Sequence, residues 1–175
     1  MRSRMILTVT IVFILGVATC AKLAGGAPPI HDITTDTSDP PLFVDVLPLR
    51  ASAKNSADYG GSRVALLQRA AYPDIAPIDL AIAPAAAFAK ALAAANAMGW
   101  AIVAADSSAG RIEATATTRV FRFRDDVVIR IRPRDGGSRL DIRSVSRIGG
   151  SDLGKNASRI REFIVRLRES VSRAP

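Results

Sequence analysis

The chain has 175 residues, a formal net charge of +8, one cysteine and one histidine. This composition excludes an intramolecular disulfide and a metal cluster built from Cys and His, because each needs more such residues than the chain contains. The length allows one globular domain together with a hydrophobic N-terminal segment.

The positive charge lies in the C-terminal part. Residues 1–110 carry eight basic and eight acidic side chains, whereas residues 111–175 carry sixteen basic and eight acidic ones. Nearly all of the excess is arginine, which favours planar, bidentate pairing with carboxylates and phosphates. A basic half is typical of proteins that bind nucleic acid, anionic lipid or an acidic partner.

Residues 1–27 are predicted to be a signal peptide or a membrane anchor. Arg2 and Arg4 precede an uncharged run from Met5 to Ala21, and Lys22 follows it. The run is at the short limit of the roughly 17–25 residues that span a bilayer. Cys20 ends a sequence that resembles a lipoprotein acylation motif, so a retained anchor, a cleaved signal and a lipoprotein all stay open.

Each alternative predicts the cell envelope as the localisation. The protein is either anchored in the inner membrane and faces the periplasm, or is exported to the periplasm. The expected partners are the membrane, through the N-terminal segment, and an envelope protein or anionic lipid. Nucleic acid is not expected in that compartment.

Residues 28–175 are predicted to form a single globular domain. Paired prolines in residues 28–50 favour an extended strap that lies on the domain surface. Residues 51–77 are predicted to form a loop and a short helix, and residues 78–175 the sheet-and-helix core. His31 lies in the strap beside Asp32, and we interpret it as a hydrogen-bonding group rather than a catalytic base.

The core begins with a predicted strand, helix and strand. Alternating apolar residues favour a strand at Ile78–Ala83. High helix propensity and a proline at the first turn predict a helix at Ala85–Met98, which Gly99 ends. A second strand is expected at Trp100–Ala105.

The third predicted strand changes phase. It carries Ile112 on one face, whereas Phe121 and Phe123 fall on the other. Because a slip of one residue inverts every later side chain, we expect a bulge near residues 117–118 that turns both phenylalanines inward. The adjacent carboxylates Asp125 and Asp126 are predicted to lie in a hairpin loop.

Two further strands are predicted to form a hairpin with a turn centred on Gly136–Gly137. This register places Arg132 opposite Asp141, which is favourable. It also places Arg130 opposite Arg143, and two like charges side by side require a carboxylate or an anion between them.

The last predicted element is a helix capped by Ser151 or Asp152. A regular apolar stripe runs along it: Leu153, Ala157, Ile160, Ile164, Leu167 and Val171. The predicted fold is therefore α+β, a single domain with a curved antiparallel sheet of about five strands and two helices on one face. The element order is β-α-β4-α.

A candidate ligand-binding site lies on the polar face of the predicted sheet and at the turn before the last helix. Its residues are Glu113, Arg130, Arg132, Asp141, Arg143, Arg147 and Ser151. A structural ion-pair network beneath the strap and an anion or lipid-headgroup site are both compatible with these residues. Arg147 and Ser151 flank a glycine turn whose backbone could cradle a phosphate. The sequence predicts no catalytic residue, no metal site and no cofactor.

Several short strings, in this order along the chain, resemble one known family. They are Pro29–Asp36, Tyr72–Ile75, Ile112–Ala114, Asp125–Asp126 with Arg130, Asp141–Gly149, and Asp152–Ala157. The set resembles the domain-of-unknown-function family 1499, which occurs in bacterial envelopes and plant chloroplasts. The resemblance runs from about residue 28 to the end and implies export and a single domain, but no reaction.

The sequence thus predicts an exported or membrane-tethered envelope protein that acts as a non-enzymatic binding or interaction module. The alternative is a carrier that holds a small lipid or anionic ligand between the sheet and the helices. An envelope hydrolase is less favoured, because no nucleophile lies beside a base in the sequence.

Overall fold

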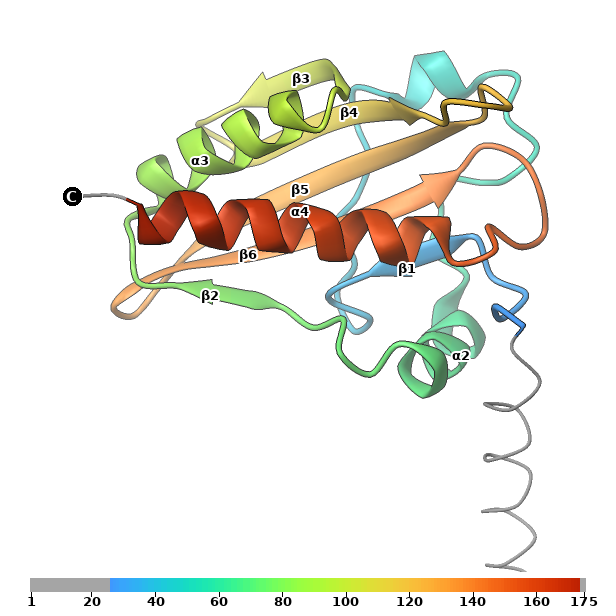
Figure 1. Ribbon diagram of the computed structural model, residues 1–175, viewed down its shortest axis with the longest axis horizontal. Coiled ribbons are helices and arrows are strands. Elements are labelled where there is room, and N and C mark those ends of the chain that lie inside the picture. Colours follow the sequence, from blue (N-terminus) through green and yellow to red (C-terminus); the bar gives the residue numbers. More distant parts are fainter. Residues whose placement is uncertain (1–25, 174–175) are drawn as a thin grey trace, which may run out of the picture.

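Six strands form one antiparallel sheet, and two long helices cover one of its faces (Figure 1). The computed structural model describes residues 26–173. The elements are β1 (Asp32–Thr34), the 3-10 helix η1 (Leu47–Arg50), α2 (Gly61–Ala71), β2 (Ile78–Leu80), α3 (Pro84–Ala97), β3 (Ala101–Asp106), β4 (Arg111–Thr117), β5 (Arg124–Arg134), β6 (Gly137–Ser146) and α4 (Lys155–Ser172). The predicted α+β class with a single antiparallel sheet is confirmed.

The strands follow the spatial order β1-β6-β5-β4-β3, and β2 also pairs with β6. β1 and β2 share the outer edge of β6, where β2 pairs with residues 138–140 and β1 with residues 143–145. β1 is the additional strand, because it comes from the segment that was predicted as an extended strap. Within residues 26–173 no helix is both long and apolar enough to cross a bilayer, and the run at Met5–Ala21 lies outside the described range.

The two helices bury side chains of different size against the sheet. α3 presents a stripe of alanines, Ala87, Ala91, Ala94 and Ala95, which allows a close approach to the strands. α4 buries Ala157, Ile160, Phe163 and Leu167. The Phe163 ring stacks on Trp100 with centroids 5.6 Å apart, and complete burial of such a side chain contributes roughly 1.5–3 kcal/mol. The predicted stripe on α4 is wrong at Leu153, which precedes the helix and is 82% exposed.

The predicted bulge near residues 117–118 is wrong, because β4 ends there. Residues 118–123 form a loop that the Thr118 N–H closes by donating to the Phe123 carbonyl, 2.8 Å away. Phe121 and Phe123 therefore point outward, 73% and 47% exposed, and stack on each other with centroids 5.6 Å apart. The change of phase marks the end of the strand rather than an irregularity within it.

Asp125 and Asp126 were predicted to lie in a loop, but both belong to β5 and both are buried. Successive residues of a strand point to opposite faces. Asp125 therefore reaches Arg159 on the helix side of the sheet, and Asp126 reaches Arg147 on the other side. Arginine partners that lie far away in the sequence stabilise two carboxylates that local propensity would place in a turn.

The β5–β6 hairpin pairs two residues away from the predicted register. Arg130 lies opposite Asp141, and Arg134 lies opposite Gly137, so the turn consists of residues 135–136. Gly136 adopts the positive φ of 75° in that turn. Gly137 belongs to the strand instead, because a Cβ there would collide with the carbonyl oxygen of Leu80 on β2. A slip of two residues leaves every side chain on its predicted face but separates Arg130 from Arg143.

The strap covers the face of the sheet opposite to α3 and α4. Phe43 and Val46 pack against Val128 and Val145 in a small second core. Charged side chains of β4, β5 and β6 surround this core, and the strap lies between them and the solvent. The sheet is therefore buried on both faces, one apolar and one largely ionic.

Candidate functional site

Three arginines converge on one carboxylate beneath the strap. Asp141, fully buried on β6, lies 3.0 Å from Arg130 Nη2, 3.4 Å from Arg132 Nη2 and 3.2 Å from Arg139 Nη2. The strap supplies two further carboxylates, of Asp36 and Asp39, to the same guanidinium groups. The hydrogen bond from Arg132 lowers the pKa of Asp39.

Arg143 holds the strap from below. Its guanidinium makes a bidentate ion pair with Asp32, with Nε–Oδ1 of 2.9 Å and Nη2–Oδ2 of 2.8 Å. It also donates to the carbonyl oxygens of Pro41 and Ala57 and lies 5.2 Å from the Phe43 ring centroid. Burial raises the pKa of Asp32, although the ion pair opposes that shift.

Arg147 forms a second buried ion pair, with Asp126. The Nε–Oδ2 and Nη2–Oδ1 distances are 2.9 Å and 2.8 Å. Arg50 of the strap approaches the same carboxylate at 2.5 Å, and the Leu49 carbonyl accepts from Arg147 Nη1 at 2.6 Å. Arg147, which the sequence placed beside a phosphate cradle, thus has internal partners in Asp126 and the Leu49 carbonyl.

Glu113 binds the strap backbone. Its two carboxylate oxygens accept from the N–H groups of Val44 and Val46, at 2.8 Å and 2.9 Å. Arg111 lies 3.1 Å from the same group. The predicted register required a carboxylate or an anion between Arg130 and Arg143, and Glu113 does not lie there.

The seven predicted site residues do not form one site. Arg130, Arg132 and Asp141 lie together, whereas Glu113, Arg143 and Arg147 each have a separate set of partners. Ser151 lies at a different place, before α4, where its hydroxyl donates to the Pro28 carbonyl. Internal carboxylates pair with these guanidinium groups, although the buried Nε of Arg130 has no hydrogen-bond partner among the described residues. The binding of an external ligand by these groups stays a prediction.

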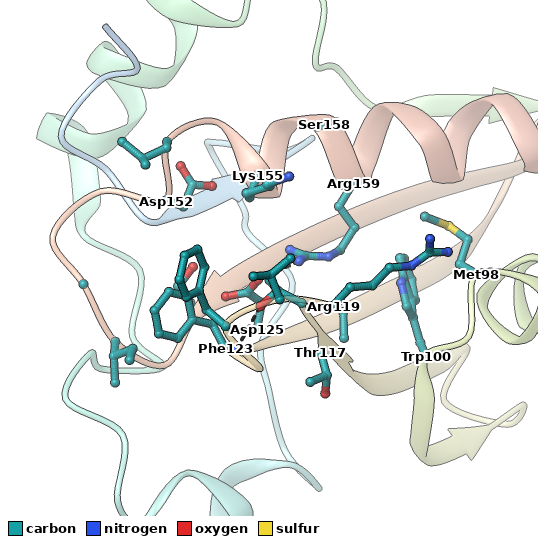
Figure 2. A pocket seen from close by; sticks show the side chains of 18 of the residues that line it. Met98, Trp100, Thr117, Arg119, Phe123, Asp125, Asp152, Lys155, Ser158 and Arg159 are labelled. Atoms are coloured by element: carbon teal, nitrogen blue, oxygen red, sulfur yellow. Dashed lines mark hydrogen bonds and ion pairs between the residues drawn. The ribbon is translucent and has the colours of Figure 1, made fainter.

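A groove opens at one end of the domain, and of the seven predicted site residues only Ser151 lines it. Its volume is about 750 Å³, and its walls come from the end of α3, the β4–β5 loop, the β6–α4 loop and the start of α4. Figure 2 shows Trp100 and Met98 on one side of this groove and Phe123 on the other. Asp152 helps to order the wall, because its carboxylate accepts from the N–H groups of Gly154 and Asn156 at 2.9 Å and 2.6 Å.

The floor of the groove carries an ion pair. Arg159 Nη2, from the second turn of α4, lies 2.6 Å from Asp125 Oδ2 (Figure 2). Arg159 Nη1 also donates to the hydroxyl of Ser144 and to Asn156 Oδ1. Arg119 and Lys155 line the same groove and have no ion pair within residues 26–173. The acids that line the groove already have partners: Asp125 pairs with Arg159, Glu162 pairs with Arg166, and Asp152 accepts backbone N–H groups. The groove thus combines an apolar lining with two cations that have no ion pair among the described residues.

The groove was not predicted. Asp125 was assigned to a loop, and Phe121 and Phe123 were assigned to the core, so no pattern brought them together. A signal was present in residues 119–124, where three arginines are interspersed with three apolar residues after the change of phase. Had the phase change been interpreted as the end of a strand, these residues would have been placed on an exposed loop.

His31 and the acidic side chains are the described residues that bear on catalysis or metal binding. The His31 side chain makes no hydrogen bond in the described part of the chain, although its backbone carbonyl accepts from Asn156 Nδ2. Within residues 26–173 no group of three His, Cys, Asp or Glu side chains is arranged to hold a metal ion. Cys20 lies outside the described residues.

The comparison with curated proteins found no similar sequence. A family model described as protein of unknown function (DUF1499) matches residues 32–167, from β1 to the buried end of α4. The match spans most of the chain and includes both faces of the sheet, and the chain belongs to the DUF1499 family.

Proposed function

We propose that this protein is a non-enzymatic binding module of the cell envelope. The N-terminal segment tethers it to the membrane, and the groove at the end of the domain binds an amphipathic anion. The groove supports this proposal, because it joins apolar walls to the unpaired cations Arg119 and Lys155.

The size and lining of the groove support a small ligand. Sites for small molecules occupy roughly 300–1,000 Å³ and are lined mainly by apolar and aromatic groups with a few placed polar ones. The groove has a volume of about 750 Å³, with Trp100, Phe121 and Phe123 among its lining residues. A ligand with an apolar body and a carboxylate or phosphate would match both kinds of lining.

The charged face beneath the strap is a weaker candidate for the ligand. Arg143 and Arg147 each donate to an internal carboxylate and to strap carbonyls. A ligand there would have to displace buried partners, and breaking such pairs costs several kcal/mol.

An envelope protein is the second candidate partner. The exposed Phe121 and Leu153 on the rim of the groove support it, because exposed apolar groups often mark a protein contact. Such a partner would add a protein mass rather than a small one.

Native mass spectrometry of the full chain, purified in mild detergent from its own compartment, tests the proposal. We expect an added mass that matches an anionic amphiphile. Arg119→Glu should lose this mass, because the reversed charge faces the ligand. Arg168→Glu, at an exposed position on α4 away from the groove, is the matched control and should keep it. A bare mass for the unaltered chain would contradict the ligand.

A further inference from the structure

Two loops form an exposed apolar surface at one end of the domain. The loops are residues 118–123, between β4 and β5, and residues 147–154, between β6 and α4. Their exposed apolar side chains are Val120, Phe121, Phe123, Ile148 and Leu153. Val120 and Leu153 are the most exposed of these, at 81% and 82%. We call these loops, together with Arg124 and Lys155, the loop end of the domain.

The loop end carries unpaired positive charge. Its exposed cations are Arg119, Arg122, Arg124 and Lys155, and none of them makes an ion pair among the described residues. The nearby acids are already engaged: Asp125 is buried against Arg159, and Asp152 accepts backbone N–H groups at the start of α4. The loop end therefore presents exposed apolar side chains together with four exposed cations.

The described chain begins at this same end. Ser151 Oγ donates to the Pro28 carbonyl at 3.1 Å, and the Asp152 N–H donates to the Ile30 carbonyl at 3.3 Å. Figure 1 shows the start of the described chain, the β4–β5 loop and the β6–α4 loop at one end of the long axis. Six residues, 22–27, separate Pro28 from the uncharged run at Met5–Ala21, and six residues reach at most about 20 Å.

We propose that the loop end docks onto the surface of an anionic phospholipid bilayer. Val120, Phe121 and Leu153 enter the boundary between headgroups and acyl chains, and the four cations face the lipid phosphates. Apolar insertion combined with basic residues is how proteins bind an anionic membrane surface. With the uncharged run in the bilayer, the short connection holds the loop end within reach of the headgroups.

This inference rests on the proposed tether but not on a ligand in the groove. It adds the orientation of the domain, with the mouth of the groove towards the bilayer. A bilayer suits the loop end because its exposed apolar side chains come from two loops. The cations beside them have no ion pair among the described residues, so they are available to lipid phosphates.

Spin labelling of the full chain in vesicles tests the docking. Cys20 is the only cysteine, so a Cys20→Ala background allows one label at a chosen site. One variant carries the label at Val120→Cys on the loop end. The matched control carries it at Asp135→Cys, in the exposed β5–β6 turn at the opposite end. Both are reconstituted into vesicles with equal parts of phosphatidylcholine and phosphatidylglycerol.

The readout compares collisions of the label with oxygen, which dissolves in the bilayer, and with a nickel chelate, which stays in water. We expect the ratio of oxygen to nickel collisions to be higher at residue 120 than at residue 135. The difference should shrink in pure phosphatidylcholine, because the attraction between cations and phosphatidylglycerol is lost. Arg119→Glu with Arg122→Glu should also reduce it. The same charge change at the exposed Arg63 and Arg168 should leave it intact.

Each other outcome overturns the docking in a distinct way. Equal ratios at both sites, with the protein still in the vesicles, would contradict the docking and leave the tether standing. A label at residue 120 that is shielded from both nickel and oxygen would indicate a protein contact instead. Protein that does not stay with the vesicles would contradict the tether and the docking together.

Discussion

Arg143 is a charged side chain with no exposed surface, and its neighbours explain how it is tolerated. The carboxylate of Asp32, two carbonyl oxygens and two aromatic rings surround the guanidinium. Hydrogen bonds and an ion pair offset the cost of removing such a charge from water. The same contacts join β6 to the strap at Pro41 and Phe43, beyond the backbone hydrogen bonds that β6 makes with residues 32–35.

We therefore expect Arg143→Ala to be strongly destabilising. The change leaves Asp32 buried without its partner, and loss of one member of a buried ion pair costs about 3–5 kcal/mol. Arg168→Ala is the matched control, since that side chain is exposed and has no ion pair among the described residues, and it should change the free energy of unfolding by less than about 0.5 kcal/mol. Urea unfolding of both variants measures the difference, and equal midpoints would show that the buried pair is not needed for stability.

Tyr59 gives a prediction about pH. Burial, and then the negative charge of Asp32, raises the pKa of the Tyr59 phenol from 10.0 to about 12. The folded state thus holds this proton more tightly than the unfolded state does. The resulting stabilisation is complete below the unfolded pKa of 10.0 and is lost as the pH rises towards the folded value of about 12.

Tyr59→Phe should remove this part of the pH dependence. The Tyr59 hydroxyl is buried without a hydrogen-bond partner in the described part of the chain. Its removal should therefore be neutral or slightly stabilising at pH 7. Tyr72→Phe is the comparison. Burial also raises the pKa of Tyr72, so this variant should lose its own part of the slope but retain the part that Tyr59 supplies. Denaturant unfolding between pH 9 and 12 measures both slopes, and an unchanged slope in Tyr59→Phe would assign the effect to another group.

The β5–β6 hairpin depends on a contact outside itself. β2 approaches so closely that a side chain at Gly137 would meet the Leu80 backbone. β2 is only three residues long, Ile78–Leu80, and both of its apolar side chains are buried. The position of β2 along β6 therefore requires that Gly137, the first residue of β6, has no Cβ.

Gly137→Ala should weaken the attachment of β2. Because the obstacle is backbone rather than a flexible side chain, the strand has to shift, and overpacking of this kind costs about 1–3 kcal/mol. Gly150→Ala is the matched control, since a Cβ there meets nothing within 4 Å and its φ is not positive. Chemical unfolding gives the loss of stability, and hydrogen exchange at Leu80 shows whether β2 detaches first. Equal behaviour of the two variants would contradict the close approach.

Local patterns predicted the elements but not the partners of their charged residues. The core strands and the two long helices follow from alternation and helical spacing, and so does the face of each side chain on the β5–β6 hairpin. The register did not follow, because Gly136–Gly137 offered two turn positions and only the contact of Gly137 with β2 decides between them.

The same limit applies to the candidate site. That arginines and carboxylates share one face of the sheet could be predicted from alternation. Which carboxylate meets which arginine could not, because Asp32 and Arg143 are 111 residues apart in the sequence. The groove was missed for a related reason: its walls come from four separate segments that meet only in the folded chain.

The two faces of the sheet also set an order of folding. The strap obtains its partners from β4, β5 and β6, at Glu113, Asp126 and Arg143. None of these partners exists until most of the chain is available, and contacts so distant in the sequence form slowly. The segment that leaves a ribosome or a translocation channel first is therefore among the last to reach its native place. If the chain crosses a membrane with its N-terminus first, the strap therefore stays undocked until β4, β5 and β6 have followed it across.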